Sequence, residues 1–449
     1  MRRLTLGTCS ALLILAAAVV TPGCGGRDND EGPGTLTYRA TTWFHYLSGT
    51  ASTSSQFQLV MSSADLTNFS AQAGATQTAG QGLIFGSVDN VSTGAGIAGA
   101  TVTALNDAGA TAGSAIYRSD VTGAFTTALT STSANGDFII FNVAPGRVNL
   151  RCATGASGNL YVNSIADETT LVALRATVPA ASNVTWTAVT RRLVNVPGVP
   201  EGDVTMDGIG TGTPFPLLSA TGTGSFTTSV PAHQTYLVRC TKALFTPTIN
   251  QVTFTTVPPS GPAPLPDLSV VLTADRDSTN FKPASVALVA GTGILRGNIT
   301  PTSGSLDGYT ITCTDLTGAG AGALRYADAT GVPIDLLSPS SSSGIFYIYN
   351  LPPGTYLIQA SKGGFAGATY ADVFADSISL VQGQLAPSVG GSGTITVGGN
   401  VVTFAGIAVS GSTVDRRGYA ATVTAGGLGV YSMTGVPTTR FFMVRVAGP

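Results

Sequence analysis

Residues 136–152 read GDFIIFNVAPGRVNLRC, and residues 344–358 repeat the pattern as GIFYIYNLPPGTYLI. Each stretch predicts a strand, a Pro-Gly turn and a second strand, arranged as a β-hairpin. Proline presets its own φ and glycine accepts a positive φ, so Pro145-Gly146 and Pro353-Gly354 suit the central positions of a type II turn. We expect the rest of the chain to be organised around these hairpins.

The strand after each turn alternates apolar and polar side chains, which predicts one buried face and one face in water. Asn149 and Arg151 are expected on the wet face. The predicted core positions are Phe138 and Ile140 with Phe346 and Ile348 before the turns, and after them Val148, Leu150 and Cys152; Tyr236, Val238 and Cys240; Tyr356, Ile358 and Ala360; and Phe442, Val444 and Val446. Cys152, Cys240 and Cys313 are therefore predicted to be buried thiols in separate cores, with no disulfide between them.

Two weaker copies of the pattern surround Pro231 and Pro437, where the turns are two residues longer. The segments that follow Gly82 and Gly293 also match in order, which indicates an internal duplication. Four copies predict an all-β chain built as a rod of about four tandem β-sandwiches. The predicted boundaries are 35–81 for an N-terminal β-hairpin and linker, 82–178 and 183–256 for the first two sandwiches, 257–290 for a Pro-rich linker, and 293–383 and 394–449 for the last two.

The repeated pattern is Gly-x-Phe-x-apolar-x-x-apolar-x-Pro-Gly-x-(Val/Tyr)-x-apolar, after an upstream Gly-x-Val strand. It resembles the carboxypeptidase regulatory-like domain, a transthyretin-like β-sandwich similar to collagen-adhesin B-type repeats and to the starch-binding-like superfamily. The match is good over 82–178 and 293–383 and poor over the other two copies. The resemblance implies antiparallel, non-catalytic accessory modules of secreted and surface proteins, and it supplies no functional residue.

The first residues of the chain carry a targeting signal. Arg2 and Arg3 precede an apolar stretch over residues 11–20, which is too short to span a membrane. Gly23 and Cys24 follow, and together these features resemble a bacterial lipoprotein signal. The resemblance implies a signal peptide over 1–23, lipid attachment at Cys24 and a polar tether over 24–34, so the expected partner is a membrane.

The residue after Cys24 is Gly25 rather than Asp, which in a two-membrane envelope implies an outer-membrane lipoprotein. The alternative is an ordinary secreted protein that is cleaved after the alanines at 16–18.

Composition excludes several classes of function. Charged residues make up 10% of the chain and the net charge is −2, which argues against nucleic-acid binding. The two histidines, His45 and His233, lie far apart and lack partners at ligand spacing. Residues 203–208 resemble the start of a calcium loop, but Pro214 stands where the bidentate acid would be required. We therefore expect no enzyme activity, no cofactor and no metal.

Aromatic side chains are the remaining candidates for a ligand site. Tyr347 and Tyr349 alternate out of phase with the core residues and are expected to face outward, and Trp43 and Tyr46 form a second group. Such rings could stack on a sugar, or they could pack against a neighbouring part of the protein. The function expected from the sequence is a non-enzymatic structural or adhesive scaffold of the cell envelope. The alternative is a carbohydrate-binding surface protein, and the expected partner is a polysaccharide or a surface protein.

Overall fold

A computed structural model describes most of the chain after residue 37. The described residues are 38–46, 53–55, 58–152, 156–178, 181–190, 199–210, 223–231, 235–253, 263–264, 268–301, 304–335, 342–363, 365–385, 394–404, 408–417, 422–437 and 441–449. The predicted signal peptide, Cys24 and the tether lie outside them. Within them the chain is mostly β-strand in several sheets, so the all-β prediction is confirmed. No helix of the described part is long and apolar enough to cross a membrane.

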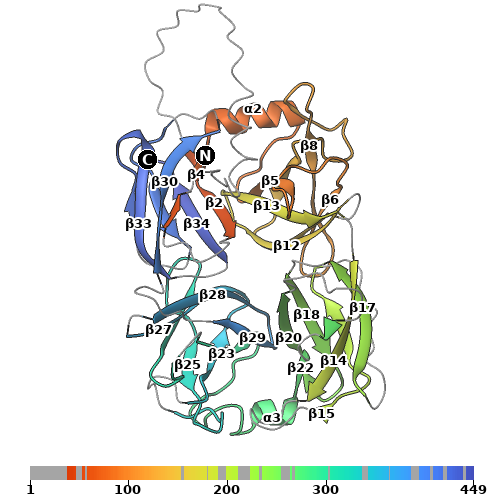
Figure 1. The fold of residues 1–449 in the computed structure, drawn as a ribbon, viewed down its shortest axis with the longest axis vertical. Helices are drawn as coiled ribbons and strands as arrows, with labels where there is room; N and C mark the ends of the chain where they lie inside the picture. The colour runs from red at the N-terminus through yellow and green to blue at the C-terminus, as the bar shows by residue number, and fades with distance from the viewer. Residues whose placement is uncertain are drawn as a thin grey trace, which may run out of the picture.

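The described strands gather into groups that we call lobes 1 to 4 (Figure 1). Lobe 1 consists of β5 (Gly82–Asn90), β6 (Val102–Leu105), β7 (Thr111–Ser114), β8 (Ile116–Arg118), β9 (Phe125–Thr126), β10 (Asp137–Val143), β11 (Gly146–Cys152), β12 (Ser157–Ser164) and β13 (Thr169–Thr177). Lobe 3 consists of β23 (Gly293–Ile299), β24 (Thr310–Asp315), β25 (Ala323–Tyr326), β26 (Ile345–Leu351), β27 (Gly354–Lys362), β28 (Phe365–Val373) and β29 (Ile378–Leu385).

Lobes 2 and 4 are each assembled from two stretches of chain. Lobe 2 consists of β14 (Ala181–Thr190), β15 (Val199–Pro200), β16 (Thr205–Gly208), β17 (Ser225–Pro231) and β18 (Thr235–Thr241), completed by β19 (Phe245–Thr246), β20 (Thr248–Thr253), β21 (Ala263–Pro264) and β22 (Leu268–Leu272). Lobe 4 consists of β30 (Thr394–Thr403), β31 (Thr413–Arg416), β32 (Thr422–Thr424), β33 (Val430–Pro437) and β34 (Phe441–Ala447), with a 3-10 turn at Gly427–Gly429. It is completed from the other end of the chain by β1 (Tyr38–Arg39), β2 (Thr41–Tyr46), β3 (Thr53–Ser55) and β4 (Gln58–Ser62).

The repeated stretch is an arch whose two strands pair with different neighbours rather than with each other, so the predicted hairpin is wrong. In lobe 1, β10 pairs with β5 and β8, whereas β11 pairs with β6 and β12. In lobe 3, β26 and β27 belong to different sheets. The predicted core residues of the two strands, such as Phe346 and Ile358, face each other across the sandwich and are fully buried. The Pro-Gly step therefore carries the chain from one layer to the other.

The residue that shapes the end of the first strand is an asparagine, not the glycine of the turn. Asn142 and Asn350 have φ of 57° and 59°, and the ladder register shifts beside both. Asparagine tolerates this left-handed backbone because its short side chain can make local hydrogen bonds. Each side chain also binds the segment before its lobe: Oδ1 of Asn142 accepts from the Thr78 amide at 2.6 Å, and Oδ1 of Asn350 accepts from the Val289 amide at 3.0 Å. Gly354 does not have the positive φ of a type II turn.

Glycine on the first strand of each duplicated lobe makes room for the phenylalanine of the arch. Gly86 lies directly opposite Phe138, and Gly297 lies directly opposite Phe346. A Cβ placed on Gly297 would lie 2.2 Å from Cζ of Phe346. The upstream glycine and the later phenylalanine of the sequence pattern are therefore two halves of one packing contact.

The described chain forms a closed circuit rather than the predicted rod. Strand β2 lies between β13 of lobe 1, with which it is parallel, and β34 of lobe 4, with which it is antiparallel. Strand β20 occupies the corresponding place between β29 of lobe 3 and β18 of lobe 2. Arg147 of lobe 1 also pairs with Asp372 of lobe 3 at 2.9 Å. Figure 1 shows the four lobes around a common centre, with the first and last strands at one end.

The circuit has an approximate two-fold repeat that begins before the segments matched in the sequence. Strands β1 to β4 complete lobe 4 with the same pairing that β19 to β22 use in lobe 2: for instance, β4 is parallel to β30, and β22 is parallel to β14. The strands in the predicted hairpin and linker region, 35–81, do not pair as neighbours: β2 pairs with β13 of lobe 1 and β34 of lobe 4, and β3 pairs with β30.

Helices follow these completing strands where linkers were expected. Residues after β4 form α2 (Ser63–Ala73), and residues after β22 form α3 (Thr273–Asp277). Helix α2 starts with a capping box between Ser62 and Asp65 and ends at Gly74, whose φ is 61°. Phe69 of α2 packs edge-on against Phe125 of lobe 1 and Phe404 of lobe 4.

Candidate functional site

The predicted aromatic platform is buried, so the expectation that Tyr347 and Tyr349 face outward is wrong. Their exposed fractions are 1% and 0%. The face of β26 opposite the sandwich core is covered by residues of 271–288, including Phe281 and Val286. Lobe 1 behaves in the same way, because Ile139 lies under α2. The alternation in the sequence was correct, but both faces of the strand are covered.

The two tyrosines are held in place by polar contacts inside this cover. The hydroxyl of Tyr349 donates to the Phe281 carbonyl at 2.7 Å, and the hydroxyl of Tyr347 donates to the Gly331 carbonyl at 3.3 Å. The rings are stacked with centroids 6.0 Å apart, and the buried Arg296 guanidinium lies 5.7 Å from the centre of the Tyr347 ring. Burial raises the pKa of Tyr349 well above its usual value. These rings fasten 268–290 to lobe 3 and are not available to a ligand.

The other predicted site residues are not brought together with this pair. Trp43 lies on β2 opposite Leu171 of β13 and packs, partly buried, against the cluster under α2. Tyr46 is the last residue of β2, and its side chain lies outside the described part, as does Cys24. Cys152, Cys240 and Cys313 are buried and free, as predicted, and burial raises the pKa of each thiol to about 12.

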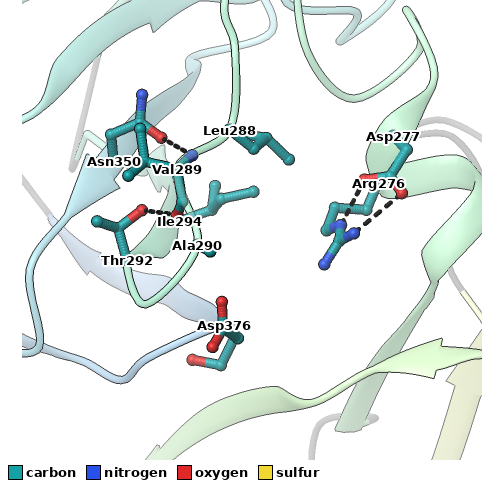
Figure 2. Close-up of a pocket in the computed structure, with 10 residues that line it drawn as sticks. Arg276, Asp277, Leu288, Val289, Ala290, Thr292, Ile294, Asn350 and Asp376 are labelled. Carbon is teal, nitrogen blue, oxygen red and sulfur yellow. Dashed lines mark hydrogen bonds and ion pairs between the residues drawn. The ribbon is translucent and has the colours of Figure 1, made fainter.

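A hollow of about 360 Å³ lies between α3 and lobe 3 (Figure 2). Its wall includes Asn350, Thr292, Asp376 and the Arg276–Asp277 pair. Asn350 and Thr292 use their polar atoms on neighbouring backbone, and Oδ1 of Asp376 accepts from the Gly291 amide at 2.8 Å. The polar groups of the wall hold loops in place, and in the described residues no three acidic, histidine or cysteine side chains gather as a metal site.

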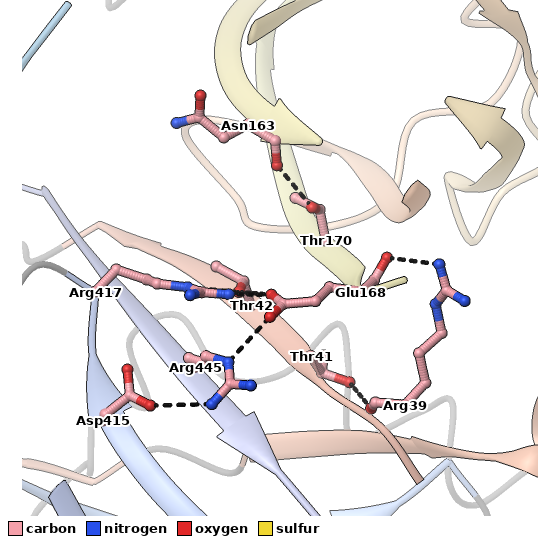
Figure 3. Close-up of polar contacts among 9 residues, drawn as sticks. All are labelled: Arg39, Thr41, Thr42, Asn163, Glu168, Thr170, Asp415, Arg417 and Arg445. Carbon is pink, nitrogen blue, oxygen red and sulfur yellow. Dashed lines mark hydrogen bonds and ion pairs between the residues drawn. The ribbon is translucent and has the colours of Figure 1, made fainter. Parts of the chain in front are cut away.

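The most concentrated charge in the described chain lies where lobes 1 and 4 meet (Figure 3). We call Thr42, Glu168, Asp415, Arg417 and Arg445 the seam cluster. The Glu168 carboxylate pairs with Arg417 on one side and with Nε of Arg445 at 3.0 Å on the other. Arg445 also reaches Asp415 at 3.4 Å. The cluster therefore joins the strand ends of lobe 1 to β31 and β34 of lobe 4.

Strand β2 takes part in the seam cluster through a buried hydroxyl. Oγ1 of Thr42 donates to Glu168 at 3.1 Å and accepts from Nη2 of Arg417 at 3.2 Å. Nη2 of Arg39 donates to the Glu168 backbone carbonyl at 3.2 Å. Burial opposes ionisation of Glu168, but the two guanidinium groups outweigh it and hold the pKa of the carboxyl below its usual value. Glu168 is thus an ionised group fixed between two cations and a hydroxyl.

Tyrosines join the duplicated lobes to their neighbours at equivalent places. The hydroxyl of Tyr161 donates to the Ile209 carbonyl at 2.7 Å, and that of Tyr370 donates to the Arg417 carbonyl at 2.8 Å. Asn149 was expected in water but is buried, because lobe 2 covers it and its amide donates to the Gly210 carbonyl at 3.0 Å. Contacts between lobes therefore use both faces of strands that the sequence indicated as half-exposed.

Lobe 1 contains a pair of buried carboxyl groups away from these junctions. Asp137 pairs with Arg118 at 3.2 Å, and Asp89 accepts from the Ser87 hydroxyl at 3.0 Å while its Oδ1 has no hydrogen-bond partner. Burial raises the pKa of Asp89 to about 6 and that of Asp137 to about 7.

Replacing Asp89 with Asn is expected to stabilise the protein at pH 8 by about 1–3 kcal/mol. The pKa of this carboxyl is raised on folding, so its contribution to stability is fully present below pH 3.8 and is lost as the pH rises through about 6. The gain in the variant should therefore nearly vanish at pH 4. Urea unfolding at both pH values measures it, with the exposed Asp307→Asn as the control. A variant less stable than the parent at pH 8 would contradict this account of Asp89.

No family model matches the sequence, and no curated protein matches it. Solved structures with some likeness include the TIE protein of Bacillus anthracis, at 13% identity over 68% of this chain and 50% of that one, with a TM-score of 0.16. They also include the minor pilin GBS52 of Streptococcus agalactiae (12% identity, 46% of this chain, 96% of that one, TM-score 0.17) and the major pilin subunit BcpA of Bacillus cereus (12%, 67%, 98%, 0.15). The chain spans about half the length of the first of these. At such scores the likeness adds nothing about function, and the chain stands as an all-β protein with a charged cluster where lobes 1 and 4 meet.

Proposed function

We propose that this protein is a non-enzymatic structural or adhesive scaffold of the cell envelope, held at the outer membrane by lipid on Cys24. The observation that supports the proposal is the closed circuit, in which strand pairing, the seam cluster and the tyrosine contacts hold the lobes as one body. Transthyretin-like modules of the carboxypeptidase regulatory-like kind would suit this role, as the sequence resemblance implies.

The position of the first strand supports a defined orientation on the membrane. Residues 24–37 separate Cys24 from β1 and reach at most about 50 Å when extended. Strand β4, with which β1 pairs, lies in the half of the molecule away from α3 (Figure 1). An anchored molecule would therefore hold lobes 1 and 4 toward the membrane and present α3 with lobes 2 and 3 outward, where an adhesive partner would bind.

Mass spectrometry of the mature N-terminus and cell fractionation test the anchor. We expect a lipid-modified Cys24 and a protein that sediments with outer membranes, whereas Cys24→Ser should be released in soluble form. An unmodified mature terminus at another residue would contradict the anchor. Adhesion of cells that display the parent, compared with cells that make Cys24→Ser, tests the adhesive role, since equal adhesion would contradict it.

Carbohydrate binding has lost its main support, because the tyrosine pair that would form the platform is buried. A glycan array with the full chain separates this alternative from the scaffold: saccharide binding above background would favour the alternative.

A further inference from the structure

Lobe 4 is incomplete without strands from the far end of the chain. Strands β1 to β4, which we call the arm, supply β2 against β34 and supply β3 and β4 against β30. If the arm left, β13, β30 and β34 would each lose a strand partner and expose backbone N–H and C=O groups. Such edges bind a strand of matching pattern strongly, because the backbone ladder re-forms.

The arm differs from its counterpart in lobe 2 in how the chain holds it. Strands β19 to β22 are continuous with β18 on one side and with α3 on the other. The arm is connected to the described chain on one side only, through α2 and the turns at Gly74 and Gly80, which have φ of 61° and 77°. Tyr38 of the arm also lies against Gly448, which follows β34: a Cβ on Gly448 would lie 2.3 Å from Cβ of Tyr38. Within the described chain, the connection through α2 is the one that would have to unfold for the arm to leave its place.

The place that the arm fills is chemically selective. The Thr42 hydroxyl bridges Glu168 and Arg417 inside the seam cluster. A strand lacking this hydroxyl would leave a buried carboxylate and guanidinium with fewer partners, which costs free energy. The same segment of a second copy satisfies every contact.

We propose that this protein forms an arm-exchanged dimer, in which strands β1 to β4 of each copy complete lobe 4 of the other. Every contact of the arm is then identical to that in the monomer, so the two states differ mainly in the connection after α2 and in the entropy of association. The monomer is favoured in dilute solution, because the linked arm has a high effective concentration at its own lobe. The dimer grows with protein concentration and after partial unfolding.

Disulfide trapping between two single-cysteine variants tests the proposal. His45 of β2 lies directly opposite Phe442 of β34. Chains carrying His45→Cys and chains carrying Phe442→Cys, both with Cys24→Ser, are mixed, partly unfolded in urea and refolded over a range of concentrations. A disulfide-linked heterodimer requires the arm of one chain to lie in the other, and the oxidant is added only after refolding, when the native thiols are buried.

The approximate two-fold repeat of the circuit supplies a matched control in lobe 2. Val252 of β20 lies opposite Tyr236 of β18 in the equivalent place. Because β20 is held from both sides, mixed Val252→Cys and Tyr236→Cys chains should give almost no heterodimer. We expect the arm pair to exceed this control at least about tenfold and to rise about tenfold for a tenfold increase in concentration. A yield no higher than that of the control would overturn the proposal.

A second measurement covers the case in which a cysteine variant does not fold. Tagged and untagged chains with native residues 38–449 are refolded together. The dimer fraction is then isolated by size exclusion and assayed for tagged and for untagged chain. Co-purification of untagged chain in that fraction supports exchange, and a monomer at every concentration overturns it. Neither readout depends on the lipid, so the proposal can fail while the anchor stands.

Discussion

Glu168→Gln is expected to lower the free energy of unfolding by about 3–5 kcal/mol, because it leaves two guanidinium groups at the seam without their shared carboxylate. Glutamine keeps the size of the side chain, so lost packing does not explain the effect. The control is Asp207→Asn, which removes the carboxylate partner of Arg239 in lobe 2, where both side chains are more exposed. That change should cost less than about 1 kcal/mol.

The pH dependence of this loss has a definite sign. The pKa of Glu168 is depressed on folding, so its contribution is present above pH 4.5 and is lost as the pH falls through the lower folded value. Urea unfolding should therefore separate parent and variant at pH 7 and bring them together in strong acid. Equal stability of Glu168→Gln and parent at pH 7 would show that the seam cluster does not hold the circuit closed.

Phe346→Ala is expected to cost about 3–5 kcal/mol, because the ring is fully buried in lobe 3 and fits over the bare backbone of Gly297. Gly297→Ala should also destabilise, since its new Cβ would lie 2.2 Å from the ring. If the two residues form one contact, the double variant should lose less than the sum of the single losses. Chemical denaturation measures all three, with the exposed Val121→Ala as a control expected to change stability by less than about 0.5 kcal/mol. Exact additivity would contradict the shared contact.

Local patterns predicted the parts of the fold that depend on neighbouring residues. Alternation placed Val148, Leu150 and Cys152 correctly in the core, and the buried thiols followed from it. Helix α2 was missed although Ser62 and Asp65 stand at capping-box spacing and Gly74 ends the helix, because a polar composition was interpreted as a linker.

Pairings between distant strands left no comparable signal. The two strands of the arch look like a hairpin because a turn joins them, yet only their partners β5, β6, β8 and β12 reveal that they do not pair with each other. Tyr347 and Tyr349 were expected to face outward. A period-two pattern shows that a strand has a second face, but it does not show what covers that face. Charge alone could have indicated the seam cluster, because only 10% of the residues are charged. Glu168 adjoins a stretch with a strand pattern, and Arg445 lies within one.

Because Tyr38 and Gly448 are in contact, the same arrangement of lobes in space could be formed by a chain in which the lobes follow one another in a different order. A covalent link across that contact would turn the circuit into a circle that could be reopened elsewhere, as circular permutation requires. Opening it at residues 254–262 would yield a chain that begins with β21 and β22 and ends with β20. In that permutant the old arm would be held from both sides, and lobe 2 rather than lobe 4 would be closed by strands from the opposite end.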